Sequence, residues 1–453
     1  MAKKKICTLK ITKRRYPDKG IAFLDGEEIA VKHGIPGQVI EAECSRKKRQ
    51  WTGRILRILE HGENEQEASC PDFGICGGCS FLSLPYEEEL NLKKDMLSNL
   101  FKDIWKNEIA VIPAPKRTGY RNKMEFAFGD SGVGAGLALG IRKRDRYYEV
   151  AVPYFCEIIP DDFKTIVGAV LKYFRGTNEM FYHRMRKTGT LRHLILRRGE
   201  FSGEILVNLV TTDKFNTALL DGLKHILMGL TLTGTITGIL HTICNSVADV
   251  VLPEAINTIY GRPMFYEGIN GRSFGISPFS FFQTNSAGAE LLYNTVVELA
   301  GDCETIYDLY CGTGTISQIL NAKKVIGVEL IKEAVEAAKE NALLNKLDNC
   351  EFIACDVLEF LGDIKKPSPD ALILDPPRSG IHPKALKKIV LLGVKKIIYI
   401  SCKPTSLVRD LPSFLDCGYH IKDIRIHDMF PITPHMETVC LLEKRKFLSG
   451  SGI

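Results

Sequence analysis

A cysteine at the end of an apolar run is the first residue whose position suggests chemistry. The run "KKIIYISC" ends on Cys402, and a lysine and a proline follow at once. Free cysteines usually pack as small buried hydrophobic side chains, whereas the carboxyl ends of strands in parallel α/β sheets collect reactive groups. Cys402 is therefore a candidate nucleophile if other reactive groups converge on the same edge.

Two acidic residues occupy comparable positions. Asp375 ends the apolar part of "DALILDPPRSG", and the prolines behind it predict a rigid turn whose side chain and carbonyl groups point into a cleft. Glu437 begins a late apolar run in "HDMFPITPHMETVCLL", after a proline-rich loop. Arg378 stands where methyltransferases acting on base nitrogens have an aromatic residue after the two prolines, which argues against methylation of an exocyclic amine.

A thiol beside carboxylic acids suits activation of a poor carbon nucleophile. C5 of a pyrimidine becomes nucleophilic when a thiolate adds at C6, because the ring is converted to an enolate. A base must then remove the C5 proton so that the thiolate can leave. Glu437 is the predicted base, and His435 is the alternative.

A glycine-containing turn predicts a nucleotide-like ligand. In "TIYDLYCGTGTISQIL" an apolar run ends near Tyr310, and Gly312 and Gly314 allow close approach of the backbone to a ligand. Glu329 ends the next run and can bind ribose hydroxyls, and Asp356 after the third run can meet an adenine amino group. The dinucleotide fingerprint Gly-x-Gly-x-x-Gly is absent, and the set instead resembles the S-adenosylmethionine (SAM) site of class I methyltransferases. Thr315, which follows Gly314, is expected to belong to the same site.

A second group of cysteines indicates metal binding. "CPDFGICGGC" brings Cys70, Cys76 and Cys79 close together, with glycines that permit tight folding of the chain. Zinc and an iron–sulfur cluster both fit these three thiols, although the first interval is wide for a zinc ribbon. A fourth ligand must come from elsewhere.

The elements that must position these groups change along the chain. Residues 1–60 consist of short runs between turns and predict a small OB-like β-barrel. Residues 61–275 are expected to form a β-rich central domain, with an amphipathic helix after Pro85 and one helix near 161–175. Residues 276–453 alternate between helix and strand and predict a Rossmann-like α/β domain with a parallel sheet.

Charge and composition narrow the partners. Residues 1–60 hold fifteen Lys/Arg and seven Asp/Glu, and "SRKKRQW" sets four cations beside Trp51, which suits phosphate contact and base stacking. The basic stretches "IRKRDRYY" and "HRMRK" either extend such a surface or are solvated strand faces. No membrane span or signal peptide is visible, so a cytoplasmic protein with reduced thiols is expected. The protein is also expected to be a monomer with no obligate protein partner.

These pieces together resemble the RNA 5-methyluridine (uracil-C5) methyltransferases, which act on tRNA and 23S rRNA. The resemblance is carried by "FFQTN", "DLYCGTGT", "GVEL", "LDPPRSG", "SCKPTSLVRDL" and "FPITPHMETV". It implies a SAM cofactor, Cys402 as nucleophile, Glu437 as proton abstractor, and Gln283, Tyr310, Glu329 and Asp375 as cofactor- or substrate-binding residues. Lys403 departs from the asparagine usual in the family, and either a phosphate contact or an effect on the pKa of Cys402 would explain it.

The same resemblance implies further modules. Residues 1–60 resemble a TRAM domain, an OB-like RNA-binding barrel. The ribosomal members bind a [4Fe–4S] cluster with a close thiol trio and one distant cysteine, which makes Cys156 the expected fourth ligand. Both features favour 23S rRNA over tRNA as substrate. A cytosine-C5 RNA methyltransferase and a non-catalytic RNA-binding factor remain the alternatives.

Overall fold

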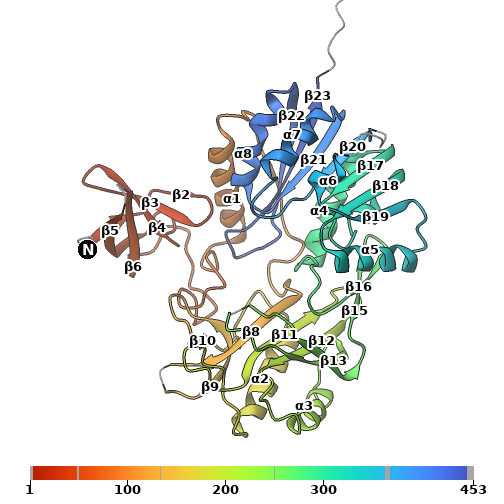
Figure 1. The fold of residues 1–453 in the computed structure, drawn as a ribbon. Helices are drawn as coiled ribbons and strands as arrows, with labels where there is room; N and C mark the ends of the chain where they lie inside the picture. Colours follow the sequence, from red (N-terminus) through yellow and green to blue (C-terminus); the bar gives the residue numbers. More distant parts are fainter. Residues whose placement is uncertain (1–3, 48–49, 133, 249, 363–367, 446–453) are drawn as a thin grey trace, which may run out of the picture.

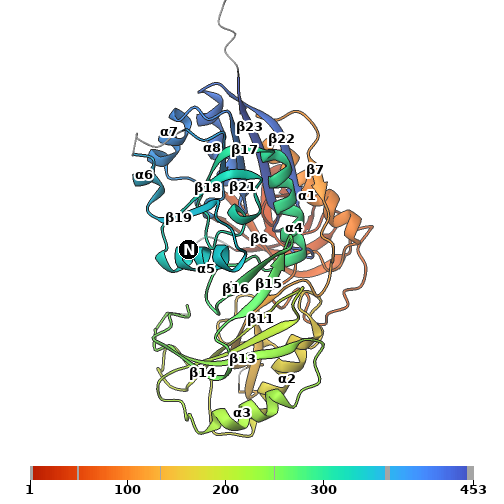
Figure 2. The same ribbon diagram turned by 90° about the vertical axis from the view of Figure 1, so that its right-hand side faces the viewer.

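The computed structural model describes residues 4–47, 50–132, 134–248, 250–362 and 368–445. The chain forms three lobes, each built around its own sheet (Figure 1). A small β lobe at the N-terminus flanks the other two. In Figures 1 and 2 the C-terminal α/β lobe lies above the central lobe, and the β15–β16 hairpin lies between them.

The N-terminal lobe is a six-stranded sheet in the order β1-β5-β6-β4-β3-β2. Alternate residues such as Ile29 and Val31 are buried, because successive side chains of a strand point to opposite faces. In this order β1 and β2 are the two end strands and are not paired with each other. The expected OB-like barrel therefore remains a prediction. The strands are β1 (Lys5–Lys10), β2 (Lys13–Arg15), β3 (Lys19–Leu24), β4 (Glu27–Lys32), β5 (Val39–Lys47) and β6 (Gln50–Glu60).

The described part of the basic stretch predicted to bind RNA lies at the end of β5 and the start of β6. Trp51 donates a hydrogen bond from Nε1 to Glu27 at 2.5 Å, and the guanidinium of Arg46 lies 5.7 Å from the centre of its ring. Lys48 and Arg49, two of the four cations, lie outside the described residues.

The central lobe has a seven-stranded sheet in the order β10-β9-β8-β11-β12-β13-β14. Only β12 and β13 among neighbours are parallel, and α3 makes the crossover between them. The prediction of a single helix here was wrong, because α3 is a ten-residue segment between runs that resemble strands. Its elements are β8 (Lys123–Asp130), β9 (Leu137–Arg142), β10 (Val150–Ala151), α2 (Asp161–Arg175), β11 (Leu191–Arg198), β12 (Glu204–Thr211), α3 (Leu219–Met228), β13 (Thr235–Ile243) and β14 (Ala255–Gly261).

The C-terminal lobe has an eight-stranded sheet in the order β19-β18-β17-β20-β21-β23-β22-β7. The five strands from β19 to β21 are parallel, as expected, whereas β23 is antiparallel to both of its neighbours. The strands are β17 (Cys303–Leu309), β18 (Ala322–Glu329), β19 (Cys350–Ala354), β20 (Ala371–Leu374), β21 (Lys396–Ser401), β22 (Tyr419–His427) and β23 (Glu437–Lys444). The helices are α4 (Ser286–Ala300), η1 (Ser317–Ile319), α5 (Lys332–Leu344), α6 (Val357–Phe360), α7 (Pro383–Leu391) and α8 (Pro404–Leu415).

The expected boundary between residues 61–275 and the C-terminal domain differs from the structure at both ends. The helix α1 (Tyr86–Phe101) buries Met96, Leu97 and Phe101 in the core of the C-terminal lobe, and β7 (Ala110–Ile112) extends its sheet beside β22 (Figure 2). The hairpin of β15 (Phe265–Ile269) and β16 (Arg272–Ile276) shares a core with α4. The sequence does not reveal this domain boundary, because a strand can pair with the edge of a sheet whose other strands are distant in the chain.

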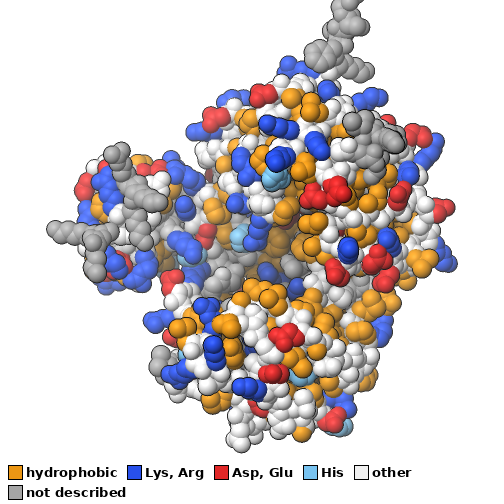
Figure 3. Space-filling view, in the orientation of Figure 1, with side chains coloured by type: hydrophobic (Ala, Val, Ile, Leu, Met, Phe, Trp, Pro, Cys, Tyr) orange, Lys and Arg blue, Asp and Glu red, His pale blue; other side chains and the backbone are white. Residues whose placement is uncertain are grey.

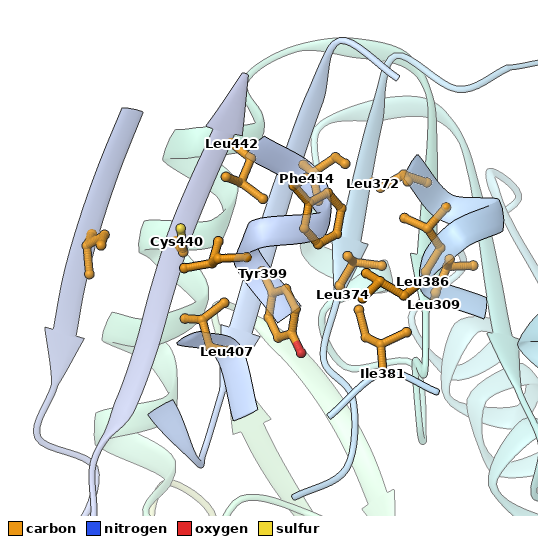
Figure 4. Close-up of a cluster of buried hydrophobic side chains, with 14 of the residues drawn as sticks. Leu309, Leu372, Leu374, Ile381, Leu386, Tyr399, Leu407, Phe414, Cys440 and Leu442 are labelled. Carbon is orange, nitrogen blue, oxygen red and sulfur yellow. The ribbon is translucent and has the colours of Figure 1, made fainter. Parts of the chain in front are cut away.

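The core of the C-terminal lobe keeps the sheet edge in place. Side chains from the sheet and from α7 and α8 interlock, among them Leu374, Tyr399 and Phe414 (Figure 4). The hydroxyl of Tyr399 donates a 2.8 Å hydrogen bond to Asp410, which satisfies a polar group that would otherwise be buried alone. Among the described helices, none is long and apolar enough to cross a membrane.

Candidate active site

The predicted reactive side chains lie at one edge of the eight-stranded sheet. Since β17, β18, β20 and β21 are parallel, their carboxyl ends share that edge, and Asp375 and Cys402 follow β20 and β21 directly. Glu437 reaches the same edge from the opposite direction, because it is the first residue of antiparallel β23. The register pairs Ser401 with Thr438, so Cys402 and Glu437 extend from adjacent strand ends.

Cys402 is half-buried and lies between carboxyl groups. Burial, followed by the charges of Glu437 and Asp375, raises its pKa to about 11. Arg378 opposes this shift, because its positive charge and then its hydrogen bond with the thiol favour the charged form. The thiol is therefore protonated at neutral pH before any ligand arrives.

The two carboxyl groups also hold their protons more strongly than usual. Burial raises the pKa of Asp375 to about 7, and the nearby carboxyl of Asp308 adds to the shift. Glu437 is only 3% exposed, and its pKa is raised well above its usual value by burial and then by Asp375, with Arg378 opposing. Titratable groups with such shifts in one place are typical of reactive sites.

Arg378, rather than Lys403, is the cation that acts on the Cys402 thiol. Arg378 supplies the positive charge beside Cys402. Lys403 is exposed at the start of α8, where its backbone N–H donates to the Ser401 hydroxyl at 3.2 Å. Of the two explanations for Lys403, the effect on the pKa of Cys402 therefore has the weaker support.

His435 is less well placed than Glu437 to serve as a base. Its ring meets that of Phe430 edge-on at a centroid distance of 6.4 Å, and desolvation, followed by the charge of Arg378, lowers its pKa. Glu437 is the group whose charge acts on Cys402. The geometry accordingly favours Glu437.

The turn after β17 forms a cradle at the same edge. Tyr310, Gly312 and Gly314 have φ values of 69°, 55° and 72°, a region that favours glycine. A Cβ on Gly314 would lie 2.6 Å from the Phe352 ring, whereas one on Gly312 would enter open space. The backbone N–H of Gly312 donates to Glu329 at 3.2 Å. The turn thus leaves room for a ligand above Gly312.

The other predicted SAM-binding residues differ in how accessible they are. Asp356 is exposed and caps α6 by accepting a 2.7 Å hydrogen bond from Leu358. Thr315 is buried, with its hydroxyl 3.4 Å from that of Thr313. Gln283 is 9% exposed and hydrogen-bonds Tyr293. Asp356 is therefore more accessible than Thr315 and Gln283.

Three further residues at this centre were not predicted. Tyr293 is buried, and its pKa is raised by burial and then by Asp375 and Glu437. Asp308 lies on β17, accepts a 2.5 Å hydrogen bond from Ser317, and has a pKa raised by burial to about 7. The only sequence signal for Asp308 is an acidic residue within an apolar run.

The third unpredicted residue comes from the N-terminal lobe. Tyr16 lies between β2 and β3, yet it packs in the core of the C-terminal lobe and is only 9% exposed. Its pKa is raised by burial and then by Cys402 and Glu437. The N-terminal lobe thus contributes a phenol close to the catalytic candidates.

The predicted metal ligands meet in a separate cavity of the central lobe. Cys70, Cys76, Cys79 and Cys156 line it together with apolar side chains such as Leu82. Burial raises the pKa of Cys79, and the charges of the other three thiols add to the shift, so all four are close in space. Within the described residues, no group of three or more Cys, His, Asp or Glu side chains is arranged to hold a metal ion, so the predicted iron–sulfur cluster stays a prediction.

Comparison with known proteins gives a consistent result. The profile described as tRNA (uracil-5-)-methyltransferase matches residues 254–445. An RNA methyltransferase of Clostridium tetani is 44% identical, with 99% of this chain and 100% of that protein covered. One of Thermotoga maritima is 34% identical, with 94% and 96% covered.

A solved structure is similar across the lobes. It is that of the Pyrococcus abyssi tRNA (uracil-54, C5)-methyltransferase in complex with S-adenosyl-L-homocysteine, with a TM-score of 0.77 and 26% identity. The match covers 96% of this chain and 100% of that chain.

Proposed function

Because the chain belongs to the RNA (uracil-5-)-methyltransferase family, we propose that it methylates C5 of a uridine in 23S rRNA through a covalent bond from Cys402. The enzyme is a SAM-dependent RNA (uracil-C5)-methyltransferase, and the covalent route and the target are the proposal. The observation that supports the route is the β21–β23 register, which brings Cys402 and Glu437 to adjacent strand ends.

Cys402 acts as the nucleophile in this proposal. The target uridine is flipped out of its stack, and the thiolate forms a bond to C6 while the C5=C6 electron pair moves toward O4. The thiol must lose its proton first, because its pKa is raised to about 11. Arg378 favours the thiolate through its hydrogen bond and charge.

Asp375 holds the base. An ionised carboxylate accepts a hydrogen bond from N3–H of uracil, whereas N3 of cytosine offers no proton in its neutral form. With a pKa of about 7, Asp375 is substantially ionised under physiological conditions. This pairing is the reason to prefer uracil over the alternative cytosine-C5 activity.

Residues at the strand ends would hold the methyl donor, and the backbone at Gly312 is free of side-chain contacts on the face where a Cβ would lie. SAM supplies the methyl group as a sulfonium. Glu329 and Asp356 offer carboxylates to hydroxyl and amino groups, the backbone at Tyr310, Gly312 and Gly314 approaches the ligand closely, and Gln283 and Thr315 support the pocket walls.

Glu437 removes the C5 proton after C5 has been methylated. The electrons of the C5–H bond re-form C5=C6, and the C6–S bond breaks to release the thiolate of Cys402. Burial beside Asp375 makes ionised Glu437 a strong base, because its pKa is raised well above the usual value. The proton ends on Glu437 and must leave before the next turnover.

The four thiols of the central lobe are proposed to hold a [4Fe–4S] cluster. An all-sulfur donor set in an apolar cavity fits such a cluster, and a cluster keeps its ligand sulfurs farther apart than a single ion does. With Cys70, Cys76, Cys79 and Cys156 as ligands, it would tie the 70–79 loop to the segment after β10. The proposed role of the cluster is structural. Stoichiometric zinc in anaerobically purified protein would contradict the cluster assignment.

The choice of 23S rRNA rests on the cluster and the N-terminal lobe. Both are features of the ribosomal members that the sequence resembles, and the N-terminal lobe would act as a TRAM-like RNA-binding module in a cytoplasmic monomer. A tRNA target is the second candidate, because the similar Pyrococcus abyssi structure is of a tRNA (uracil-54, C5)-methyltransferase. Mapping 5-methyluridine in rRNA and tRNA of a deletion strain separates the two.

Trapping tests the covalent route. RNA with 5-fluorouridine at the target should form a stable adduct, because fluorine cannot leave as a proton from methylated C5. The adduct should survive denaturing electrophoresis and map to the Cys402 peptide. If wild-type enzyme turns over uridine RNA but gives no adduct with the fluorinated RNA, the route is wrong.

A further inference from the structure

A cavity on the central lobe is lined by aromatic and arginine side chains, and the methylation reaction does not use it. Its walls come from β8, β9 and β11, from the loop between β9 and β10, from residues 182–184 and from residues 247–248 after β13. Lining residues include Phe128, Arg142, Tyr147, Tyr148, Tyr182, Arg184, Arg192 and His193. We propose that this cavity binds one unpaired nucleotide of the RNA substrate, and this inference rests on the proposed function.

The aromatic rings at the cavity pack against one another. Tyr148 stacks on the ring of His183 with centroids 4.2 Å apart and planes 22° from parallel. Tyr147 meets Tyr148 edge-on at 4.8 Å, and its side chain is 41% exposed. Exposed rings of this kind bind unpaired bases by stacking, which tolerates any base because every base has a π face.

Arginine side chains lie over the same rings. The guanidinium of Arg142 is 4.9 Å and that of Arg184 is 5.3 Å from the centre of the Tyr147 ring. Arg184 also donates to the Tyr147 hydroxyl at 3.3 Å. Planar guanidinium groups both stack on bases and contact phosphate, so the cavity offers a partner for each part of a nucleotide.

Hydrogen bonds from one arginine organise the floor of the cavity. Arg192 is buried and donates hydrogen bonds to the carbonyl groups of Cys244, Ser246 and Ala248, at 3.1, 2.6 and 2.9 Å. The same guanidinium lies 4.8 Å from the centre of the Tyr182 ring. These contacts hold the 244–248 segment against Arg192 and Tyr182.

The rim attracts a polyanion. Residues 142–149 and 183–187 contain seven Lys/Arg and two acidic residues, Asp145 and Glu149. Figure 3 shows Lys and Arg side chains gathered, with hydrophobic ones between them, over the part of the central lobe where β9 and β10 lie. A solvated strand face would explain the charge but not a preformed aromatic cavity beneath it.

Binding of fluorescein-labelled single-stranded RNA to the full-length enzyme tests the proposal. Tyr147→Ala and Arg184→Ala should each weaken binding about tenfold, the contribution typical of one stacked base, and Tyr147→Phe should restore it. Tyr260→Ala is the matched control, because Tyr260 is 40% exposed on β14 of the same sheet and lies outside the cavity. Duplex RNA of the same sequence should show a smaller loss.

The outcomes separate this inference from the proposed function. Equal affinities of Tyr147→Ala and Tyr260→Ala for single-stranded RNA, or an equal loss for duplex RNA, would overturn the nucleotide site. A raised KM for RNA with unchanged kcat in Tyr147→Ala supports it. Absence of a 5-fluorouridine adduct with wild-type enzyme overturns the covalent route alone, because stacking in the cavity does not require Cys402.

Discussion

Two groups of cysteines in this enzyme lie in opposite surroundings. Cys402 is half-buried at a strand end, with two carboxyl groups and the guanidinium of Arg378 beside it. The four thiols near Cys79 lie in an apolar cavity, and their mutual charge adds to the effect of burial. The first setting suits a thiol that must change protonation and bond partner within each turnover, and the second suits thiolates neutralised permanently by a metal group.

The comparison also concerns how each group is assembled. The catalytic candidates come from strand ends of one sheet, so their separation is set by strand pairing. The cavity thiols come from a tight loop at 70–79 and from Cys156 after β10, so their separation depends on loop packing. Loss of one cavity thiol should therefore loosen structure, whereas loss of Cys402 should remove chemistry and leave structure intact.

Cys402→Ala should have the largest effect on activity. Without the sulfur no C6 adduct forms, and methyl transfer to RNA should fall at least about 10³-fold. RNA affinity, measured by fluorescence anisotropy, should remain near that of wild type. Retained 5-methyluridine formation would show that another group attacks C6.

Glu437→Gln should slow turnover about 10²- to 10⁴-fold, the range typical of a lost general base. The methylated RNA should remain bound to Cys402, because the C5 proton cannot leave, and intact-protein mass spectrometry would detect it. His435→Ala is the control and should turn over normally. A normal rate in the Glu437 variant together with a slow rate in the His435 variant would show that His435 is the base.

The pH dependence should rise toward the alkaline side. Cys402 with a pKa of about 11 and Glu437 with a raised pKa must both be ionised, and Asp375 gains charge through pH 7. Single-turnover kcat/KM should thus increase between about pH 6 and pH 9, by up to about tenfold per unit where one group limits. A bell centred below pH 7 would contradict these assignments.

Arg378→Ala should have a smaller effect, of about tenfold. Loss of the guanidinium raises the pKa of Cys402 further, and one pKa unit lowers the thiolate fraction tenfold. The rate of reaction of the thiol with iodoacetamide at pH 8 measures this directly. Lys403→Ala should leave that rate unchanged, and a comparable drop would restore the electrostatic role for Lys403.

Cys156→Ala should affect catalysis least and structure most. Iron in anaerobically purified protein should fall from about four per chain, and the melting temperature should decrease. Trapping of 5-fluorouridine RNA by the folded fraction should persist, because Cys402 is in another lobe. Full iron content in this variant would show that the fourth ligand is a different residue.

Much of the fold was predictable because its signals are local. The α/β alternation after residue 280, the amphipathic helix after Pro85 and the helix at 161–175 follow from apolar spacing and match α1, α2 and the parallel strands. The helix α3 was missed, since a short segment among strand-like runs carries little periodicity. The place of β7 in the C-terminal sheet was missed because strand pairing is non-local.

The sequence by itself determined which side chains could react: a cysteine and carboxylates at the ends of apolar runs, glycines in a turn, and a close trio of thiols. Only the tertiary structure decided that antiparallel β23 sets Glu437 beside Cys402, that Arg378 is the cation at the thiol, and that Tyr16 reaches the site from another lobe. The tertiary structure also brings side chains of "IRKRDRYY" and "HRMRK" together around one aromatic cavity. The physical reason is that residue types and strand ends are encoded locally, whereas burial, pairing and charge environment arise from contacts between segments far apart in the chain.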